Sequence, residues 1–194
     1  MKKTVGTIVT MLVISVSIGA FYYYQKNRTD PPKDQNQSEL KEIEIMLDKN
    51  LEKDYPATAK EAVNLYSHMT KVLHSEITDE EVELLGKKLR DFYDEELLQK
   101  NKIEDYLFDL KIDVATYRNN NKIIRSYEID SDSIETNVID ELEYTTMNVL
   151  YRMKDNKASY SLTEKFILRK DDNGRWKILG WNVVDSKSTN DTSE

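Results

Sequence analysis

Residues 159–184, SYSLTEKFILRKDDNGRWKILGWNVV, decide the fold of this chain. Polar and apolar residues alternate on both sides of the turn sequence Asp171-Asp172-Asn173-Gly174, in which Gly174 supplies the positive φ that a tight hairpin requires. A period of two is typical of a half-buried strand. The stretch therefore predicts two antiparallel strands, 159–170 and 176–184.

The same period continues toward the N-terminus and predicts strands at 142–153, 133–138 and 122–129. With an even number of residues in each hairpin loop, the last three strands share one apolar face. This face carries Met147, Val149, Tyr151, Met153, Tyr160, Leu162, Phe166, Leu168, Leu179, Trp181 and Val183. The opposite face is polar, and its apolar exceptions could form a dimer surface. These exceptions are Leu150, Ile167, Trp176 and Ile178.

Upstream of residue 120 the apolar period is 3.6, which predicts helices at 40–51, after Thr58, after Thr78 and at 103–117. Thr58-Ala59-Lys60-Glu61 and Thr78-Asp79-Glu80-Glu81 have the form of capping boxes, in which each side chain satisfies a backbone donor at the helix start. Together the elements predict an α+β fold, with three to four helices packed on a curved antiparallel sheet.

The run that begins at Thr4 and ends at Tyr24 is uncharged and spans about 31 Å as a helix, the thickness of a bilayer core. Lys2 and Lys3 precede it and an aromatic cluster closes it, so we expect a single-pass cell-membrane protein with its N-terminus inside. The alternative is a signal peptide cleaved after Ser17-Ile18-Gly19, which would release a secreted domain.

Composition divides the chain into four parts. Residues 25–38 contain Pro31-Pro32 and no other apolar residue, which is typical of an extended linker, and the residues after Asp185 are too polar to pack. We therefore expect a cytoplasmic tail and transmembrane anchor at 1–24, a linker at 25–38, an extracytoplasmic α+β domain at 39–185 and a disordered tail at 186–194.

Charge and residue usage argue against several classes of function. The chain has 36 acidic and 28 basic residues, with a net charge of −8, and the basic residues are interleaved with acidic ones, so no nucleic-acid partner is expected. It has no cysteine, which excludes disulfides, thiolate metal sites and a cysteine nucleophile.

No metal site, cofactor or catalytic group stands out. His68 and His74 are six residues apart, which does not place two ligands on one helix face, and we expect both at the surface. The acidic run Asp91, Asp94, Glu95 and Glu96 is most simply a solvated helix end.

The order of elements, helices first and then a sheet, resembles the nuclear-transport-factor-two-like cone fold. The end of the sheet adds to this resemblance with the sequence Gly174-Arg175-Trp176-Lys177-Ile178-Leu179-Gly180-Trp181. That resemblance implies a ligand space between the helices and the inner sheet face, used by some members for isomerase or dehydratase chemistry.

The chain is also similar to an uncharacterised family of membrane-anchored proteins from gut clostridia. The matching stretches are Asp54-Tyr55-Pro56, Tyr93-Asp94-Glu95-Glu96-Leu97-Leu98, and Leu168-Arg169-Lys170-Asp171 running into Trp176-Lys177-Ile178. This second resemblance covers residues 51–185 and implies no site residues.

Glu164 is the polar residue on the apolar sheet face, between Leu162 and Phe166. A carboxyl group there would have a raised pKa and could act as a general base or as a ligand contact. A pocket around it would take its other walls from Trp181, Tyr151 and Tyr160. The alternative is that the sheet edge, or a lysine or tyrosine from a helix, satisfies the carboxyl group.

The leading hypothesis is a non-enzymatic, membrane-tethered module that binds a protein partner or a second copy of itself. Its anchored cone architecture would be similar to that of inner-membrane subunits of type IV secretion and conjugation machines, an analogy at the level of fold alone. The alternative is a small-ligand-binding domain, or a lyase or isomerase that uses Glu164 as its base.

Overall fold

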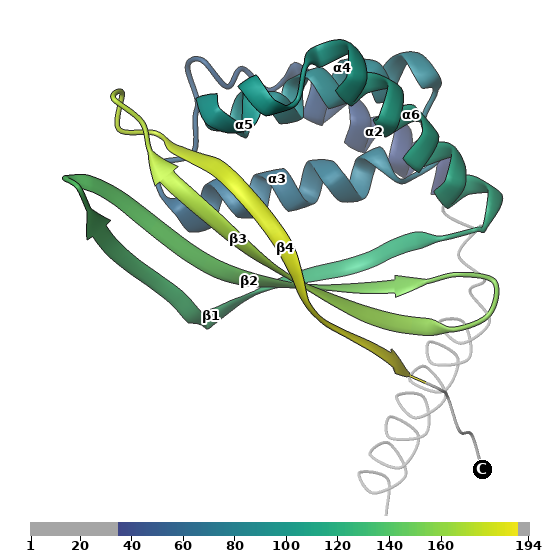
Figure 1. The fold of residues 1–194 in the computed structure, drawn as a ribbon. Helices are drawn as coiled ribbons and strands as arrows, with labels where there is room; N and C mark the ends of the chain where they lie inside the picture. The colour runs from purple at the N-terminus through teal and green to yellow at the C-terminus, as the bar shows by residue number, and fades with distance from the viewer. Residues whose placement is uncertain (1–34, 190–194) are drawn as a thin grey trace, which may run out of the picture. The chain divides into compact units, whose positions relative to one another are not determined.

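The computed structural model describes residues 35–189 of the 194-residue chain. Within the described residues, the chain from Glu39 on forms one compact unit. In the described residues this unit has five α-helices, a short 3-10 helix and a four-stranded sheet (Figure 1). The elements are α2 (Gln35–Asp48), α3 (Ala59–Leu73), α4 (Asp79–Leu89), η1 (Arg90–Phe92), α5 (Glu95–Lys100), α6 (Ile103–Asn119), β1 (Ile123–Ile139), β2 (Leu142–Lys154), β3 (Ser159–Lys170) and β4 (Trp176–Thr189).

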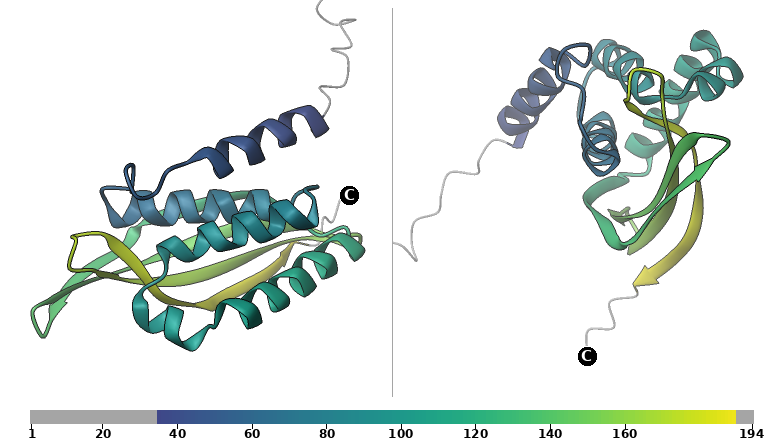
Figure 2. Two further views of the ribbon diagram at one scale, coloured as in Figure 1. Left: turned by 90° about the horizontal axis from the view of Figure 1, so that it is seen from above. Right: turned by 90° about the vertical axis from the view of Figure 1, so that its left-hand side faces the viewer.

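The sheet has the order β1-β2-β3-β4, and each neighbouring pair is antiparallel. Met147 pairs with Phe166 and Tyr151 with Leu162, which confirms that β2 and β3 share the predicted apolar face. All the helices lie on that side of the sheet, as the two further views show (Figure 2). The predicted α+β class, with helices on an antiparallel sheet, is therefore confirmed.

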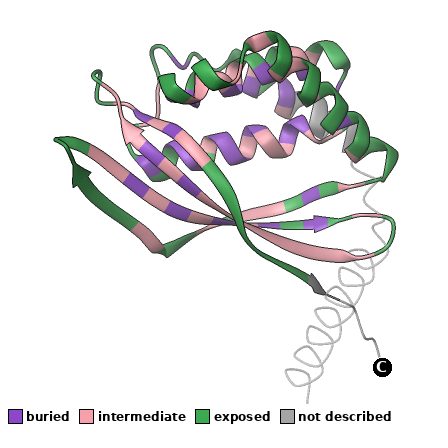
Figure 3. Cartoon of the chain, in the orientation of Figure 1, coloured by how far each residue is buried: buried purple, intermediate pink, exposed green. Residues whose placement is uncertain are grey.

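The core lies between α3 and this sheet face. Buried residues alternate along β2 and β3 and form a stripe along α3 (Figure 3). Met69 of α3, Met147 of β2 and Phe166 of β3 are each 0% exposed. Because alternation on the strands and helical spacing on α3 agree on which faces are apolar, the two layers bury one continuous core.

Both predicted capping boxes are present. The Thr58 hydroxyl accepts from the Glu61 backbone N–H, and the Glu61 carboxylate accepts in return from the Thr58 N–H. Thr78 and Glu81 make the same exchange at the start of α4. Each box satisfies backbone donors that would otherwise be unpaired, and this fixes where α3 and α4 begin.

Two predicted strands, 122–129 and 133–138, are one strand in the structure, so that part of the prediction is wrong. β1 pairs with β2 on both sides of an irregularity between Asp130 and Glu135. Inside it, the Ser133 hydroxyl donates to the Asp130 carbonyl and accepts from the Asn148 N–H. These bonds replace the lost ladder bonds, so the strand bends without ending.

The prediction that Trp176 and Ile178 face away from the helices is also wrong. Ile167 pairs with Gly180 while Leu168 pairs with Ile178, so β4 contains one extra residue at this point. An extra residue reverses which face the following side chains take. Trp176 and Ile178 are consequently 9% and 0% exposed and belong to the core, and they cannot contribute to an outer dimer surface.

The ends of the domain differ from the expected boundaries. α2 begins at Gln35, inside the range expected to be an extended linker, and β4 continues to Thr189. Ser186 and Thr189 pair with Leu162 and Ser159, because a ladder forms through backbone groups and does not need apolar side chains.

No helix in the described part of the chain is long and apolar enough to cross a membrane. The expected anchor at 4–24 lies outside the described residues.

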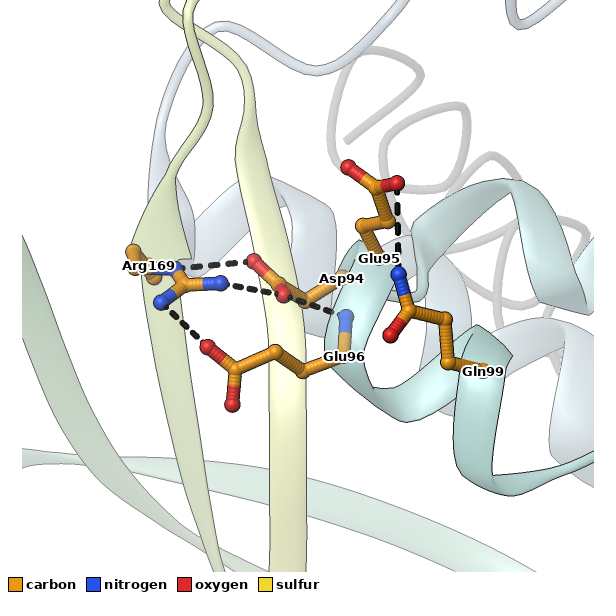
Figure 4. Close-up of polar contacts among 5 residues, drawn as sticks. All are labelled: Asp94, Glu95, Glu96, Gln99 and Arg169. Carbon is orange, nitrogen blue, oxygen red and sulfur yellow. Dashed lines mark hydrogen bonds and ion pairs between the residues drawn. The ribbon is translucent and has the colours of Figure 1, made fainter.

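A buried ion pair joins α5 to the sheet. Arg169 of β3 donates to both carboxylate oxygens of Asp94, at 2.6 and 3.1 Å, and to Glu96 at 2.8 Å (Figure 4). Asp94 also caps α5 by accepting from the Glu96 N–H, and its own N–H donates to the Ile178 carbonyl at 2.8 Å. The Asp94 side chain is only 5% exposed, so the expectation of a solvated acidic helix end is wrong at this residue.

We expect Asp94→Asn to lower the free energy of unfolding by about 3 kcal/mol, because it leaves the buried face of the Arg169 guanidinium without its anionic partner. Denaturant unfolding of both proteins measures this difference. The matched control is Glu95→Gln, since Glu95 points away from Arg169 and contacts only Gln99 in Figure 4. A control variant as unstable as Asp94→Asn would contradict the assignment.

Candidate functional site

A cavity of about 210 Å³ lies between the helices and the inner face of the sheet. Its walls come from α3, α4, α6, Tyr93 just after η1, and all four strands. Aromatic side chains make up much of its lining, and these are Tyr66, Tyr93, Tyr106, Tyr117, Tyr151 and Trp181. The remaining ionisable groups in the lining are His74, Asp113 and Glu164.

Glu164 reaches this cavity from the middle of β3. It pairs with Val149 on one side and Val183 on the other, so its neighbours across the sheet are apolar. Its carboxyl group has no hydrogen-bond partner among the described residues. The alternative considered from the sequence, a lysine or tyrosine that bonds to this carboxyl group, is not found among them. Burial raises the pKa of Glu164, while the electrostatic effect of His74 acts in the opposite direction.

His74 and Asp113 form a second polar group in the cavity. The His74 Nδ1 lies 2.8 Å from the Thr70 carbonyl oxygen, and its Nε2 lies 3.0 Å from an Asp113 carboxylate oxygen. Both ring nitrogens of His74 are therefore held by oxygen atoms of the protein. Its side chain is 7% exposed, which corrects the expectation that His74 lies at the surface.

The tyrosine hydroxyls are bonded to one another. Tyr66 and Tyr93 hydroxyls lie 3.3 Å apart, and a side-chain hydrogen bond joins Tyr93 to Tyr106. The Tyr151 hydroxyl lies 2.9 Å from the Ser67 hydroxyl. Burial raises the pKa of Tyr66, Tyr93 and Tyr106, so these hydroxyls stay neutral. Tyr66, Tyr93 and Tyr106 thus form one hydrogen-bonded chain of hydroxyls in the wall of the cavity.

Trp181 stands at the edge of the cavity and is 39% exposed. Its ring lies 6.0 Å from the Phe166 ring at an interplanar angle of 22°, and it contacts Tyr66 and Tyr93 at tilted angles. A second cavity of about 280 Å³ adjoins the first, sharing Tyr93, Tyr106 and Trp181 and bordering Gly180. Trp181 therefore lines both cavities, together with Tyr93 and Tyr106.

The structure brings together three of the four predicted pocket residues. Glu164, Trp181 and Tyr151 line the cavity, whereas Tyr160 does not belong to its lining. Tyr160 lies four residues from Glu164 along β3, about 13 Å at the rise of a strand, and its ring is near the Lys122 ammonium. Sequence reasoning missed the groups from α6, because Asp113 and Tyr117 meet His74 only through the packing of α6 on α3.

Glu164→Gln is expected to stabilise the protein at neutral pH. A group whose pKa is raised on folding contributes stability below its unfolded pKa, near 4.5, and this contribution is lost as the pH rises through the folded value. The amide carries no charge, so the variant should unfold at a higher temperature than the wild type at pH 7 and should lose this advantage below pH 4.5.

Thermal unfolding at the two pH values measures the effect. Glu135→Gln is the matched control, because Glu135 is an exposed glutamate on β1 and its replacement should change stability little at either pH. Equal behaviour of the two variants would contradict the burial of a charged carboxylate at Glu164.

Comparison with known families gives one match. A family model described as a domain of unknown function, DUF6715, matches residues 1–181. No curated protein sequence matches the chain. The match accords with the expectation of an uncharacterised family, while the anchor and the clostridial origin stay predictions. Because residues 1–181 are most of its length, the chain belongs to the DUF6715 family.

Proposed function

We propose that this chain is a ligand-binding module tethered to a membrane. Residues 4–24 would anchor it, with the N-terminus inside the cell and the α+β domain outside the cytoplasm. The uncharged run of sequence, the preceding lysines and the closing aromatic cluster support the anchor. A secreted domain, released by cleavage near Gly19, is the alternative for this part of the proposal.

The observation that carries the binding function is the unpartnered Glu164 carboxyl group in a cavity lined by aromatic rings. Ligand sites are concave and largely apolar, with a few polar groups that fix the orientation of the ligand. Because an apolar cavity of about 150 Å³ can hold benzene, a cavity of about 210 Å³ suits a ligand of roughly eight non-hydrogen atoms. The resemblance to the cone fold supports the same proposal, since ligands of that fold bind between helices and sheet.

A lyase or isomerase activity with Glu164 as general base is a second candidate. The raised pKa of this carboxyl group favours it, because a base works best when its pKa approaches the working pH. The bonded hydroxyls of Tyr66, Tyr93 and Tyr106 could stabilise charge that develops on a substrate. Turnover of a bound ligand, lost in Glu164→Gln while binding remains, would distinguish this activity from binding alone.

Binding of a protein partner, or of a second copy in a homodimer, is a third candidate. The β1–β2 hairpin extends beyond the helical layer in Figure 1, and its tip exposes Val138, Ile139 and Leu142 at 68%, 56% and 39%. Apolar side chains grouped on a projecting hairpin favour contact with another surface. Crosslinking in membranes, followed by analytical ultracentrifugation of the purified chain, tests this candidate.

A small-molecule screen against the full chain in detergent should give ligands whose binding is lost in Leu162→Trp. Leu162 lines the cavity from β3, so an indole there fills the space that a ligand needs. Leu150→Trp is the matched control, because Leu150 lies on the opposite face of the sheet next to Thr163. Ligands that bind both variants equally would show that the cavity is not the site.

Membrane fractionation tests the anchor. We expect the full-length chain to stay with membranes after carbonate extraction and to dissolve only in detergent, because residues 4–24 cross the bilayer. A variant that lacks residues 1–24 should be recovered in the soluble fraction. A wild-type chain found outside the cell, shortened at its N-terminus, would instead support the cleaved and secreted form.

A further inference from the structure

The polar groups of the cavity differ in one respect that bears on the ligand. The hydroxyls of Tyr66, Tyr93 and Tyr106 bond to one another, and both nitrogens of His74 have acceptors. Glu164 is the polar group of this lining that has no hydrogen-bond partner in the described part of the chain. A desolvated carboxylate without a partner is costly, and a cation is the partner that relieves this cost most.

The position of Trp181 suits a cation beside Glu164. Phe166 pairs with Trp181 and Glu164 pairs with Val183, so Glu164 and Trp181 are diagonal neighbours on the inner sheet face. Such neighbours lie about 7–8 Å apart, which leaves room for one small group between a carboxylate and an indole ring. Trp181 stacks on Phe166 through one face, and the indole is the aromatic ring that attracts cations best.

The remaining charges of the cavity agree with a positive ligand. The lining contains two carboxylates, Asp113 and Glu164, and one basic side chain, His74, which is bonded to Asp113. Acidic groups therefore outnumber basic ones in this space. Both ring nitrogens of His74 already bond to Thr70 and Asp113, so neither is left as a donor for an anionic ligand. Tyrosines from α3, α6 and β2 line the same cavity, and burial raises their pKa, so they stay neutral.

We propose that the cavity binds an organic cation, a protonated amine with a small apolar body. Its ammonium group would lie between the Glu164 carboxylate and the Trp181 ring, and its apolar part would contact the tyrosine-lined wall. This inference rests on the proposed binding function and names the ligand class of the same cavity. Simple inorganic cations suit it less, because they need several oxygen ligands and the described residues contain no group of three or more acidic or histidine side chains that could hold a metal ion.

Three probes of nearly the same shape test the charge preference, namely benzylamine, benzyl alcohol and benzoate. Calorimetric titration of the full chain in detergent at pH 7 should give at least tenfold tighter binding of benzylamine than of the other two. In Glu164→Gln the affinity for benzylamine should fall to that for benzyl alcohol. In Trp181→Leu it should fall about threefold or more, because the cation–π contribution is lost. Glu135→Gln should bind as the wild type does.

Each contrary result has a distinct meaning. Equal or tighter binding of benzyl alcohol or benzoate, abolished by Leu162→Trp, overturns the cation preference and leaves the proposed binding function in place. Benzylamine binding that survives both Glu164→Gln and Leu162→Trp occurs elsewhere and overturns the inference. No binding of benzylamine at millimolar concentration also overturns it, and the wider screen then decides whether the cavity binds ligands of another class.

Discussion

The arrangement of the two layers depends on the contact between Asp94 and Arg169. Asp94 accepts two bonds from the Arg169 guanidinium, caps α5, and donates its N–H to the Ile178 carbonyl, so one residue joins α5 to β3 and β4. Tyr93 precedes it and forms an isolated bridge with Ile178. Because Tyr93 lines both cavities, the ion pair also fixes the wall between them.

Two irregularities in the pairing of β4 with β3 affect which side chains of β4 face the site. The extra residue near Leu179 turns Trp176 and Ile178 into the core while Trp181 still faces inward. A second shift of the pairing between β3 and β4 comes directly after Val183, the residue that pairs with Glu164. Bulges bend a strand and re-aim its side chains. Without the first shift, a strand that buries Ile178 would turn Trp181 away from the cavity.

Alternation of residues was enough to predict the shared face of β2 and β3 and the inward position of Glu164, because both depend on pairing within one hairpin. The two capping boxes could also be predicted from the sequence, since each is contained in four residues. The burial of Asp94 could not be predicted in this way, because its partner Arg169 is 75 residues away in the sequence. The His74–Asp113 contact spans 39 residues and two helices, and no local pattern specifies how those helices pack.

Asp94, which is buried, and Glu164, which is half-buried, show how two carboxylates in one domain can be told apart. Both carboxylate oxygens of Asp94 accept hydrogen bonds, two from Arg169 and one from the Glu96 N–H, which is what a carboxylate needs if its role is to hold elements together. Glu164 is half-buried beside apolar strands without such a partner among the described residues, and burial raises the pKa of its carboxyl group. Such departures from local rules persist where a function requires them. Of the two, it is therefore Glu164, and not the better-bonded Asp94, that points to a ligand.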